Sequence, residues 1–265
     1  MPTFQPQDAA LREHIEHYWI VDADEALAHL SAPLHEFTSL APELVLGIEG
    51  RLGYVQRGHA QVVREATFFG HIDQGLTVHP EALRQMVVVR FKPHGVSSML
   101  PFVPHRAVEL VRCGIGPARE VFGASITALD RHIRLLPPRT VADELDTYFQ
   151  RRLDLQQTGL VREVMPRITP TTTVRDLAAL TRASYSTVER HFKRELGLTP
   201  KRFLMRNRFK HVLADLFRSH HTDWFEYIVR YGYHDQMHFI KEIKRFSGFT
   251  PRQLLTLPYF THYRP

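Results

Sequence analysis

The feature that most constrains this chain is one stretch that occurs twice, 51 residues apart. Residues Phe192–Pro200 read FKRELGLTP, and residues Ile243–Pro251 read IKRFSGFTP. The same offset holds upstream, where Ser184 corresponds to Asp235. Self-similarity at a fixed spacing indicates one supersecondary unit used twice.

Local signals within each copy predict two short helices joined by a tight turn. Ser184 and Asp235 are residue types that begin helices, and an apolar stripe follows each at helical spacing. Gly197 and Gly248 stand where a helix ends in a left-handed residue, and the Thr-Pro pair after each glycine begins another helix. The shorter upstream helices are expected over Val174–Thr181 and Trp224–Tyr231. This arrangement is typical of a helix-turn-helix.

Charge divides the chain at about the same place as the repeat. Residues 158–265 contain 19 Lys and Arg against 9 Asp and Glu, whereas the preceding residues contain 15 against 19. A basic region that coincides with two helix-turn-helix units indicates a nucleic-acid-binding domain. We expect it to be all-α, with the two units joined by a long helix over Lys201–Arg218.

The N-terminal half contains short, β-branched segments separated by glycine and charge. We expect Glu43–Ile48 and Gly53–Gln56 to be two strands around a turn, with further strands at Leu76–Val78 and Gln85–Phe91. Strands of this length and spacing predict a small antiparallel β-barrel or sandwich with accompanying helices. The whole chain is therefore predicted to be α+β.

These signals give four segments. Residues 1–138 are expected to form a sensory, ligand-binding domain, and residues 139–157 a linker helix that is also a candidate dimer contact. Residues 158–257 form the double helix-turn-helix domain, and residues 258–265 a tail. The Pro137-Pro138 pair and the polar residues 156–159 mark the two breaks.

Basic and short polar side chains lie opposite the apolar stripe of each second helix, at about 100° per residue. Arginine binds guanine bidentately, serine and threonine bind several base edges, and basic residues near helix ends suit phosphates. In the first unit these DNA-binding candidates are Ser184, Ser186, Thr187, Arg190, Lys193 and Arg194. In the second unit they are Met237, His238, Lys241, Lys244 and Arg245.

The C-terminal region resembles the double helix-turn-helix domain of the AraC/XylS family of bacterial transcription regulators. The match is carried mainly by Ile228–Pro251, IVRYGYHDQMHFIKEIKRFSGFTP, and by the corresponding residues of the first unit. The resemblance implies that the two second helices enter successive major grooves on one face of DNA. It implies base contacts at Ser186, Glu189 and Arg190, and at Gln236, Met237 and Lys241.

The sequence departs from the family pattern at two positions. Ile243 replaces a usual phenylalanine, which is a conservative change in the core. Thr181 stands where the second unit has Gly232, so we expect a different turn in the first unit.

The N-terminal half resembles, more loosely, the cupin-like sensory domains that precede this module. Tyr18-Trp19, Pro42-Glu43-Leu44 and Val89–Gly95 carry that likeness.

Residues that could support catalysis or bind a metal do not form a recognisable set. Cys113 is the only cysteine, which excludes an intrachain disulfide and a cysteine-based zinc cluster. His14 with His17, and His234 with His238, have helical spacing for a metal, but no third ligand can be assigned to either pair. We therefore expect no catalytic residues, no metal and no cofactor, and Cys113 is expected to be a small buried side chain.

The sequence predicts a sequence-specific, DNA-binding transcription regulator of the cytoplasm, and not an enzyme. Its expected partners are double-stranded DNA and a small-molecule effector of unknown identity, with RNA polymerase and a second copy as further candidates and no membrane. One alternative is an enzyme in the N-terminal barrel with a fused DNA-binding module. Another is an architectural DNA-binding protein without a ligand.

Overall fold

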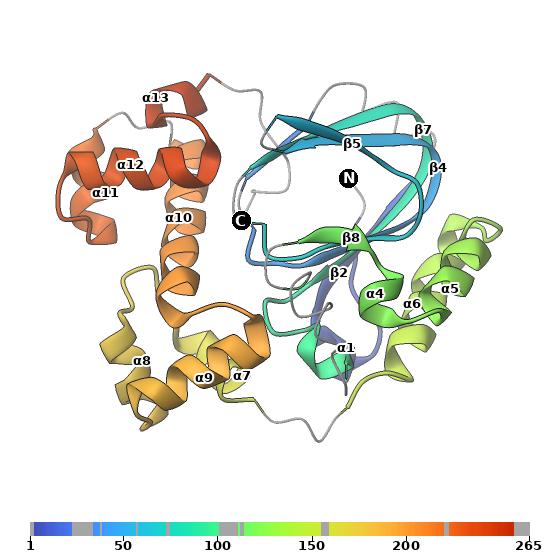
Figure 1. Ribbon diagram of the computed structural model, residues 1–265, viewed down its shortest axis with the longest axis horizontal. Helices are drawn as coiled ribbons and strands as arrows, with labels where there is room; N and C mark the ends of the chain where they lie inside the picture. Colours follow the sequence, from blue (N-terminus) through green and yellow to red (C-terminus); the bar gives the residue numbers. More distant parts are fainter. Residues whose placement is uncertain are drawn as a thin grey trace.

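The computed structural model consists of a curved antiparallel sheet with helices on one side and a helical C-terminal domain on the other (Figure 1). It describes residues 3–22, 34–37, 39–56, 58–72, 75–100, 111, 114–154, 159–219 and 223–256. The expectations for Cys113, for the boundary at residues 156–158 and for the tail over 258–265 concern residues outside these ranges.

The sheet contains eight described strands, all paired antiparallel, in the order β1-β2-β7-β4-β6-β8, with β3 on β7 and β5 on β4. The strands are β1 (Thr3–Phe4), β2 (Ile15–Val21), β3 (Leu34–Glu36), β4 (Glu43–Gln56), β5 (His59–Val63), β6 (Thr67–Phe69), β7 (Leu76–Phe91) and β8 (Ile115–Pro117). This arrangement confirms the predicted α+β class and the antiparallel β domain.

Two predicted strand pairs are in fact single long strands. The expected turn between Glu43–Ile48 and Gly53–Gln56 is instead an irregularity inside β4, whose register against β7 shifts twice there. Gly47 and Gly50 take positive φ values of 65° and 108° at this irregularity. Glycines in such conformations mark bulges as well as turns, and bulges bend a sheet. The prediction of two separate strands was wrong because glycine marks a bulge within one strand as well as a turn between two.

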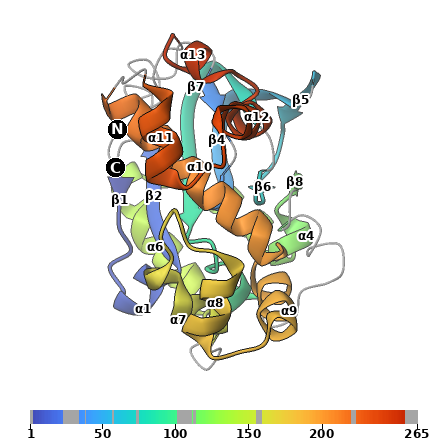
Figure 2. The same cartoon turned by 90° about the vertical axis from the view of Figure 1, so that its left-hand side faces the viewer.

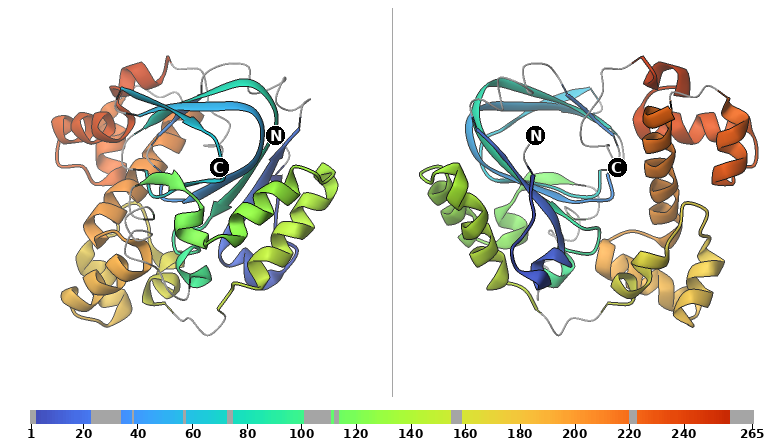
Figure 3. Two further views of the ribbon diagram at one scale, coloured as in Figure 1. Left: turned by 45° about the vertical axis from the view of Figure 1, so that its right-hand side comes forward. Right: turned by 180° about the vertical axis from the view of Figure 1, so that it is seen from behind.

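Four of the described helices belong to the first domain, and three of them, α4 to α6, lie on the side away from the C-terminal domain (Figure 3). They are α1 (Ala9–Arg12), α4 (Arg119–Phe122), α5 (Ser125–Ile133) and α6 (Pro138–Gln150). Helix α6 buries Val141, Leu145 and Phe149 in the sheet's core, and the hydroxyl of Tyr18 donates to Asp146 at 2.7 Å. The helix expected as a linker over residues 139–157 is thus part of the first domain's core, and its role as a dimer contact stays a prediction.

The second domain is built around the 20-residue helix α10. Figure 1 shows a group of shorter helices at each of its ends. The first group is α7 (Leu160–Val164), α8 (Val174–Thr181) and α9 (Tyr185–Leu196), and the second, after α10 (Pro200–Ser219), is α11 (Trp224–Tyr231), α12 (Gln236–Ser247) and α13 (Pro251–Leu254). No described helix is long and apolar enough to cross a membrane.

The caps predicted for the repeated helices are present. Ser184 and Asp235 accept hydrogen bonds from the backbone of Thr187 and His238, and Gly197 and Gly248 are left-handed. The turns themselves differ between the two units. Helix α11 ends at left-handed Gly232, but α8 continues through Thr181 and places Arg182 in the left-handed conformation, with φ 51° and ψ 35°. The first turn is therefore one residue shorter, as the missing glycine predicted.

Because the two turns differ, we expect two substitutions to have opposite effects on stability. Gly232→Ala puts a Cβ on a residue with φ 67°, and no heavy atom lies within 4 Å of it, so the cost is confined to the backbone. We expect a loss of about 1 kcal/mol in the free energy of unfolding, and a gain of about 0.5–1 kcal/mol for Arg182→Gly. Denaturant unfolding of the full chain measures both. Changes of the same sign would contradict the assigned turns.

Candidate nucleic-acid interface

Helix α9 presents its predicted reading face to solvent. Ser186, Glu189 and Arg190 are exposed, as are Lys193, Arg194 and the N-cap Ser184. Thr187 is only partly exposed, because its backbone N–H and hydroxyl are both used by the cap with Ser184, at 3.2 and 3.0 Å.

The charged residues of this face differ in their partners. The Lys193 ammonium lies 2.6 Å from the Glu189 carboxylate, and Arg194 contacts His191 and Glu195. Within the described residues Arg190 has no ion pair. A guanidinium without an ion-pair partner can approach a base or a phosphate directly, so Arg190 is the best placed of the predicted base-contacting residues on α9.

Helix α12 exposes a corresponding face. Gln236, Met237, Lys241, Lys244 and Arg245 are exposed, and Met237 keeps 58% of its surface accessible. His238 is half-buried, since its ring lies 5.3 Å from that of Tyr233 and its Nε2 3.8 Å from Glu242. Among the described residues neither Lys241 nor Lys244 has an ion pair, while the Arg245 guanidinium lies 5.5 Å from the Phe246 ring. The structure thus exposes most of the predicted residues and partly buries Thr187 and His238.

A buried ion pair fixes the orientation of α12 on α10. Glu242 is 3% exposed and accepts two hydrogen bonds from the Arg208 guanidinium, at 2.9 and 2.6 Å. The Tyr233 hydroxyl donates to the same carboxylate at 2.9 Å, and Arg208 stacks 4.3 Å from the Tyr233 ring. Bidentate geometry of this kind restricts rotation of the helix, and with it the direction of the reading face.

A second buried carboxylate holds α9. Glu195 accepts from the backbone N–H of Val161 on α7 at 3.0 Å and contacts His191 at 2.9 Å. A Cβ on Gly159 would lie 2.3 Å from this carboxylate, so a larger residue there would displace the Glu195 side chain.

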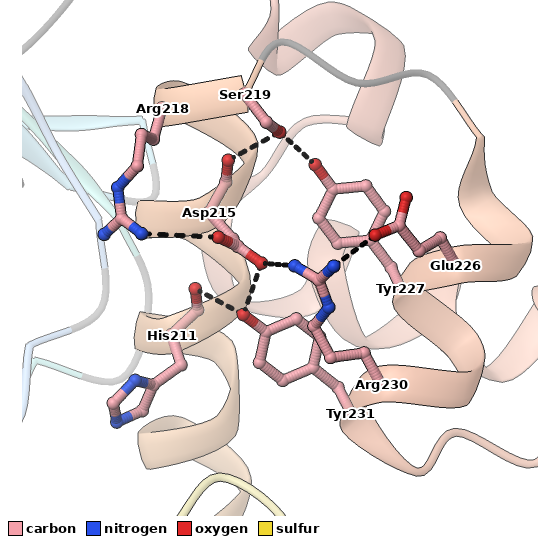
Figure 4. A network of polar contacts seen from close by, with 8 residues as sticks. All are labelled: His211, Asp215, Arg218, Ser219, Glu226, Tyr227, Arg230 and Tyr231. Carbon is pink, nitrogen blue, oxygen red and sulfur yellow. Dashed lines mark hydrogen bonds and ion pairs between the residues drawn. The ribbon is translucent and has the colours of Figure 1, made fainter.

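Helix α11 is attached to the end of α10 by a polar network around Asp215 (Figure 4). Asp215 accepts from Arg230 at 2.6 Å and from the Tyr231 hydroxyl at 2.9 Å, and Ser219 joins Tyr227 at 2.9 Å. Burial would raise the pKa of Asp215, but the hydrogen bonds from Tyr231 and Arg230 outweigh it and lower that pKa. This network completes the support of the second unit.

The positioning residues Glu195, Arg208 and Glu242 were not among the sequence-predicted site residues. One signal for Glu242 was available: it falls on the apolar stripe between Phe239 and Phe246, where a carboxylate requires a buried cation. The identity of that cation was not readable, because Arg208 lies 34 residues away.

The first domain contacts both helix-turn-helix units directly. Phe37 belongs to the apolar core around Phe209 and α12, with its ring 6.1 Å from that of Phe217, and Leu40 belongs to the core around Phe203 and α9. Between them Arg206 of α10, 1% exposed, donates to the backbone carbonyl of His71 at 3.3 Å. We call Phe37 and Leu40 the bridging residues.

A partly open cavity lies inside the curve of the sheet, and the roughly 610 Å³ of atom-free space within its outline includes open solvent. Apolar side chains form most of its wall, and Glu36 and Glu43 are its acidic members. Burial raises the pKa of Glu36 to about 8, assisted by the charge of Glu43 and opposed by Arg90. Burial also raises the pKa of Glu43, although Arg90 forms an ion pair with it.

The two histidine pairs considered as metal ligands lie apart: His17 is on β2, while His234 donates its backbone N–H to the His238 ring. His14 is buried with its ring 5.7 Å from that of His94, and burial together with the charge of His94 lowers the pKa of His14 to about 4. His71 is buried at the domain contact, and His234 is exposed beside α12. Across the described ranges, no three His, Cys, Asp or Glu side chains are grouped closely enough to hold a metal ion.

Comparison with known families identifies the C-terminal segment. The sequence of residues 177–256 matches the family model described as a helix-turn-helix domain. These residues form a helix-turn-helix domain of the AraC/XylS type. The match confirms the resemblance predicted from the repeat and covers both units from α8 to α13. No curated protein matches the chain.

The chain is only distantly similar to solved structures. ToxT from Vibrio cholerae O395 is 8% identical, with a TM-score of 0.42 over 90% of this chain and 95% of that chain. ToxT from Vibrio cholerae strain SCE256 bound to an unsaturated fatty acid is 11% identical, with a TM-score of 0.40 over 85% and 95%. The AraC-like activator CuxR is 12% identical, with a TM-score of 0.24 over 75% and 74%. These values are too low to carry a statement about shared function.

The buried pair in the helix-turn-helix domain generates a prediction. Glu242→Gln keeps the shape of the side chain but leaves the Arg208 guanidinium without its counterion in a buried position. We expect a loss of about 2–4 kcal/mol in the free energy of unfolding, because breaking a buried pair exposes its desolvation cost. Thermal or denaturant unfolding measures it.

Glu189→Gln on the exposed face of α9 is the matched control. That variant removes only a surface pair with Lys193 and should change stability by less than about 1 kcal/mol. Equal effects of the two variants would show that Glu242 does not hold α12.

Proposed function

We propose that the chain is a sequence-specific, DNA-binding transcription regulator that inserts α9 and α12 into successive major grooves. The observation that carries this proposal is the pair of helix-turn-helix units at opposite ends of α10, each with an exposed, basic second helix. Helices of this motif place their exposed face against base edges. A single helix that belongs to both units makes them act as one reading surface.

The side chains on the two faces support selective reading in addition to charge attraction. Arg190 can pair with guanine, and Gln236 can bind adenine bidentately, while exposed Met237 suits the methyl group of thymine. Lys244 and Arg245, in the last turn of α12, are better placed for phosphates, which contribute affinity without sequence choice.

The N-terminal domain is proposed to sense a small molecule and to change how the reading helices are held. Glu36 lines the cavity, and the next residue, Phe37, is buried in the core of the second unit. Leu76 also lines the cavity, and a Cβ on the preceding Gly75 would lie 3.3 Å from the carbonyl oxygen of Ser247 in α12. Glu36 of β3 and Leu76 of β7 thus both line the cavity. The residue adjacent to each, Phe37 or Gly75, meets the DNA-binding domain.

Selection from a random DNA library by the full chain tests the proposal. The expected result is a sequence with two conserved blocks about one helical turn apart, since each unit reads one groove. The selected site should be bound far more tightly than random DNA at physiological salt. Uniform binding that falls steeply with salt for every sequence would contradict the proposal and leave only electrostatic attraction.

Two substitutions test the assigned readers. Arg190→Ala and Lys241→Ala should each weaken binding to the selected site by about 1–3 kcal/mol and relax choice at a few base pairs. Arg139→Ala removes a positive charge from an exposed position on α6, in the first domain, and serves as the control. Competition binding on a set of single-base variants measures both effects. If either reader variant lost affinity equally for selected and random DNA, its role in base reading would be wrong.

A further inference from the structure

The cavity in the sheet is lined by aromatic residues from three strands. Trp19 on β2, Tyr54 on β4 and Phe69 on β6 are all buried, and the rings of Tyr54 and Phe69 meet edge to face with centroids 5.7 Å apart. Aliphatic side chains such as Met86 and Val88 complete the wall. Aromatic faces carry negative charge density, so walls of this composition attract organic cations.

The polar groups of the cavity are acidic. Glu36 on β3 and Glu43 on β4 line it, and no lysine, arginine or histidine is among its described lining residues. Arg90 pairs with Glu43 and lies 3.4 Å from Glu16, and it faces the space between the domains instead of the cavity. One guanidinium is therefore shared among three nearby carboxylates.

Glu36 is the carboxylate that this arrangement leaves uncompensated. Its side chain makes no hydrogen bond or ion pair with the described residues, and it is only partly accessible. The charged groups that act on it are Glu43, which opposes its ionisation, and Arg90, which favours it from beyond Glu43. An isolated carboxylate beside an apolar space is stabilised by an opposite charge placed in that space, and it repels a like one.

We propose that the cavity binds a small organic cation, an ammonium group carried on an apolar or aromatic body, with Glu36 as its counterion. The apolar walls take the body, the aromatic side chains surround the charge, and Glu36 faces it. The proposal deepens the sensory role above and rests on it for the consequence of binding. The binding step itself is measured without DNA.

Isothermal titration of the full chain with three probes of one shape tests the charge preference. The probes are 2-phenylethylamine, 2-phenylethanol and 3-phenylpropionate, which share a phenylethyl body and differ in the charge of the head group. We expect the amine to bind at least about tenfold more tightly than the alcohol, and the acid more weakly than both. Equal affinities, tightest binding of the acid, or no heat from the amine at millimolar concentration would overturn the proposal.

Two variants locate the counterion. Glu36→Gln should weaken amine binding about tenfold and leave alcohol binding unchanged, which also shows that the cavity is intact. Glu49→Gln, an exposed glutamate on β4, should change neither. Loss of amine binding in the Glu49 variant, or full retention in the Glu36 variant, would contradict the assignment.

A permanent cation adds a pH readout that a purely structural role of Glu36 would not give. Because the pKa of Glu36 is raised to about 8 in the unliganded protein, the fraction ionised increases strongly between pH 6.5 and 8.5. Affinity for benzyltrimethylammonium should therefore rise about tenfold over this range, and Glu36→Gln should abolish the rise. A flat profile in the unsubstituted protein would count against Glu36 as the counterion.

The outcomes separate this inference from the proposed function. Specific DNA binding without amine binding would refute only the claim that the cavity binds an organic cation. Amine binding by a chain that selects no DNA sequence would refute only the proposed role as a sequence-specific regulator.

Discussion

The packing of α10 is the interaction on which the rest of this structure depends. One end of the helix contributes Phe203 to the core of the first unit, and the other contributes Phe209 and Leu216 to the core of the second. Arg206, between those ends, is buried against the N-terminal domain. Both units and the N-terminal domain therefore pack against one continuous helix, and this packing contributes to their relative positions (Figure 2).

The bridging residues Phe37 and Leu40 give the N-terminal domain a direct influence on both units. They lie three positions apart in sequence yet belong to different cores of the second domain. In the proposed mechanism, a shift of β3 would act on both units through these residues, and Glu36 of the same strand lines the cavity. The proposed coupling needs no long chain of contacts, because the cavity-lining residue Glu36 and the bridging residue Phe37 are neighbours. Packed cores change between discrete arrangements, which is how a small local shift becomes a switch.

Local chemistry explains what could be predicted from the sequence. The second-domain helices follow from caps at Ser184 and Asp235 and glycines at 197 and 248, each of which acts within one turn. Strands were harder: β7 runs through Pro80 and a left-handed Ala82, features that also end strands. Periodicity alone predicted most of the residues that α9 and α12 expose. The groups that orient these helices were not predictable, because Glu242 and Arg208 meet only through tertiary folding.

The central claim is that the bridging residues set the separation of the two reading helices. Spin labels at Ser186→Cys and Met237→Cys, in a Cys113→Ser background, place one probe on each exposed face. Double electron–electron resonance on the full chain should give one narrow distance distribution. Replacing both Phe37 and Leu40 by alanine should broaden or shift it while each unit stays folded. An unchanged distribution in that variant would show that α10 alone holds the helices, and that the N-terminal domain does not control them.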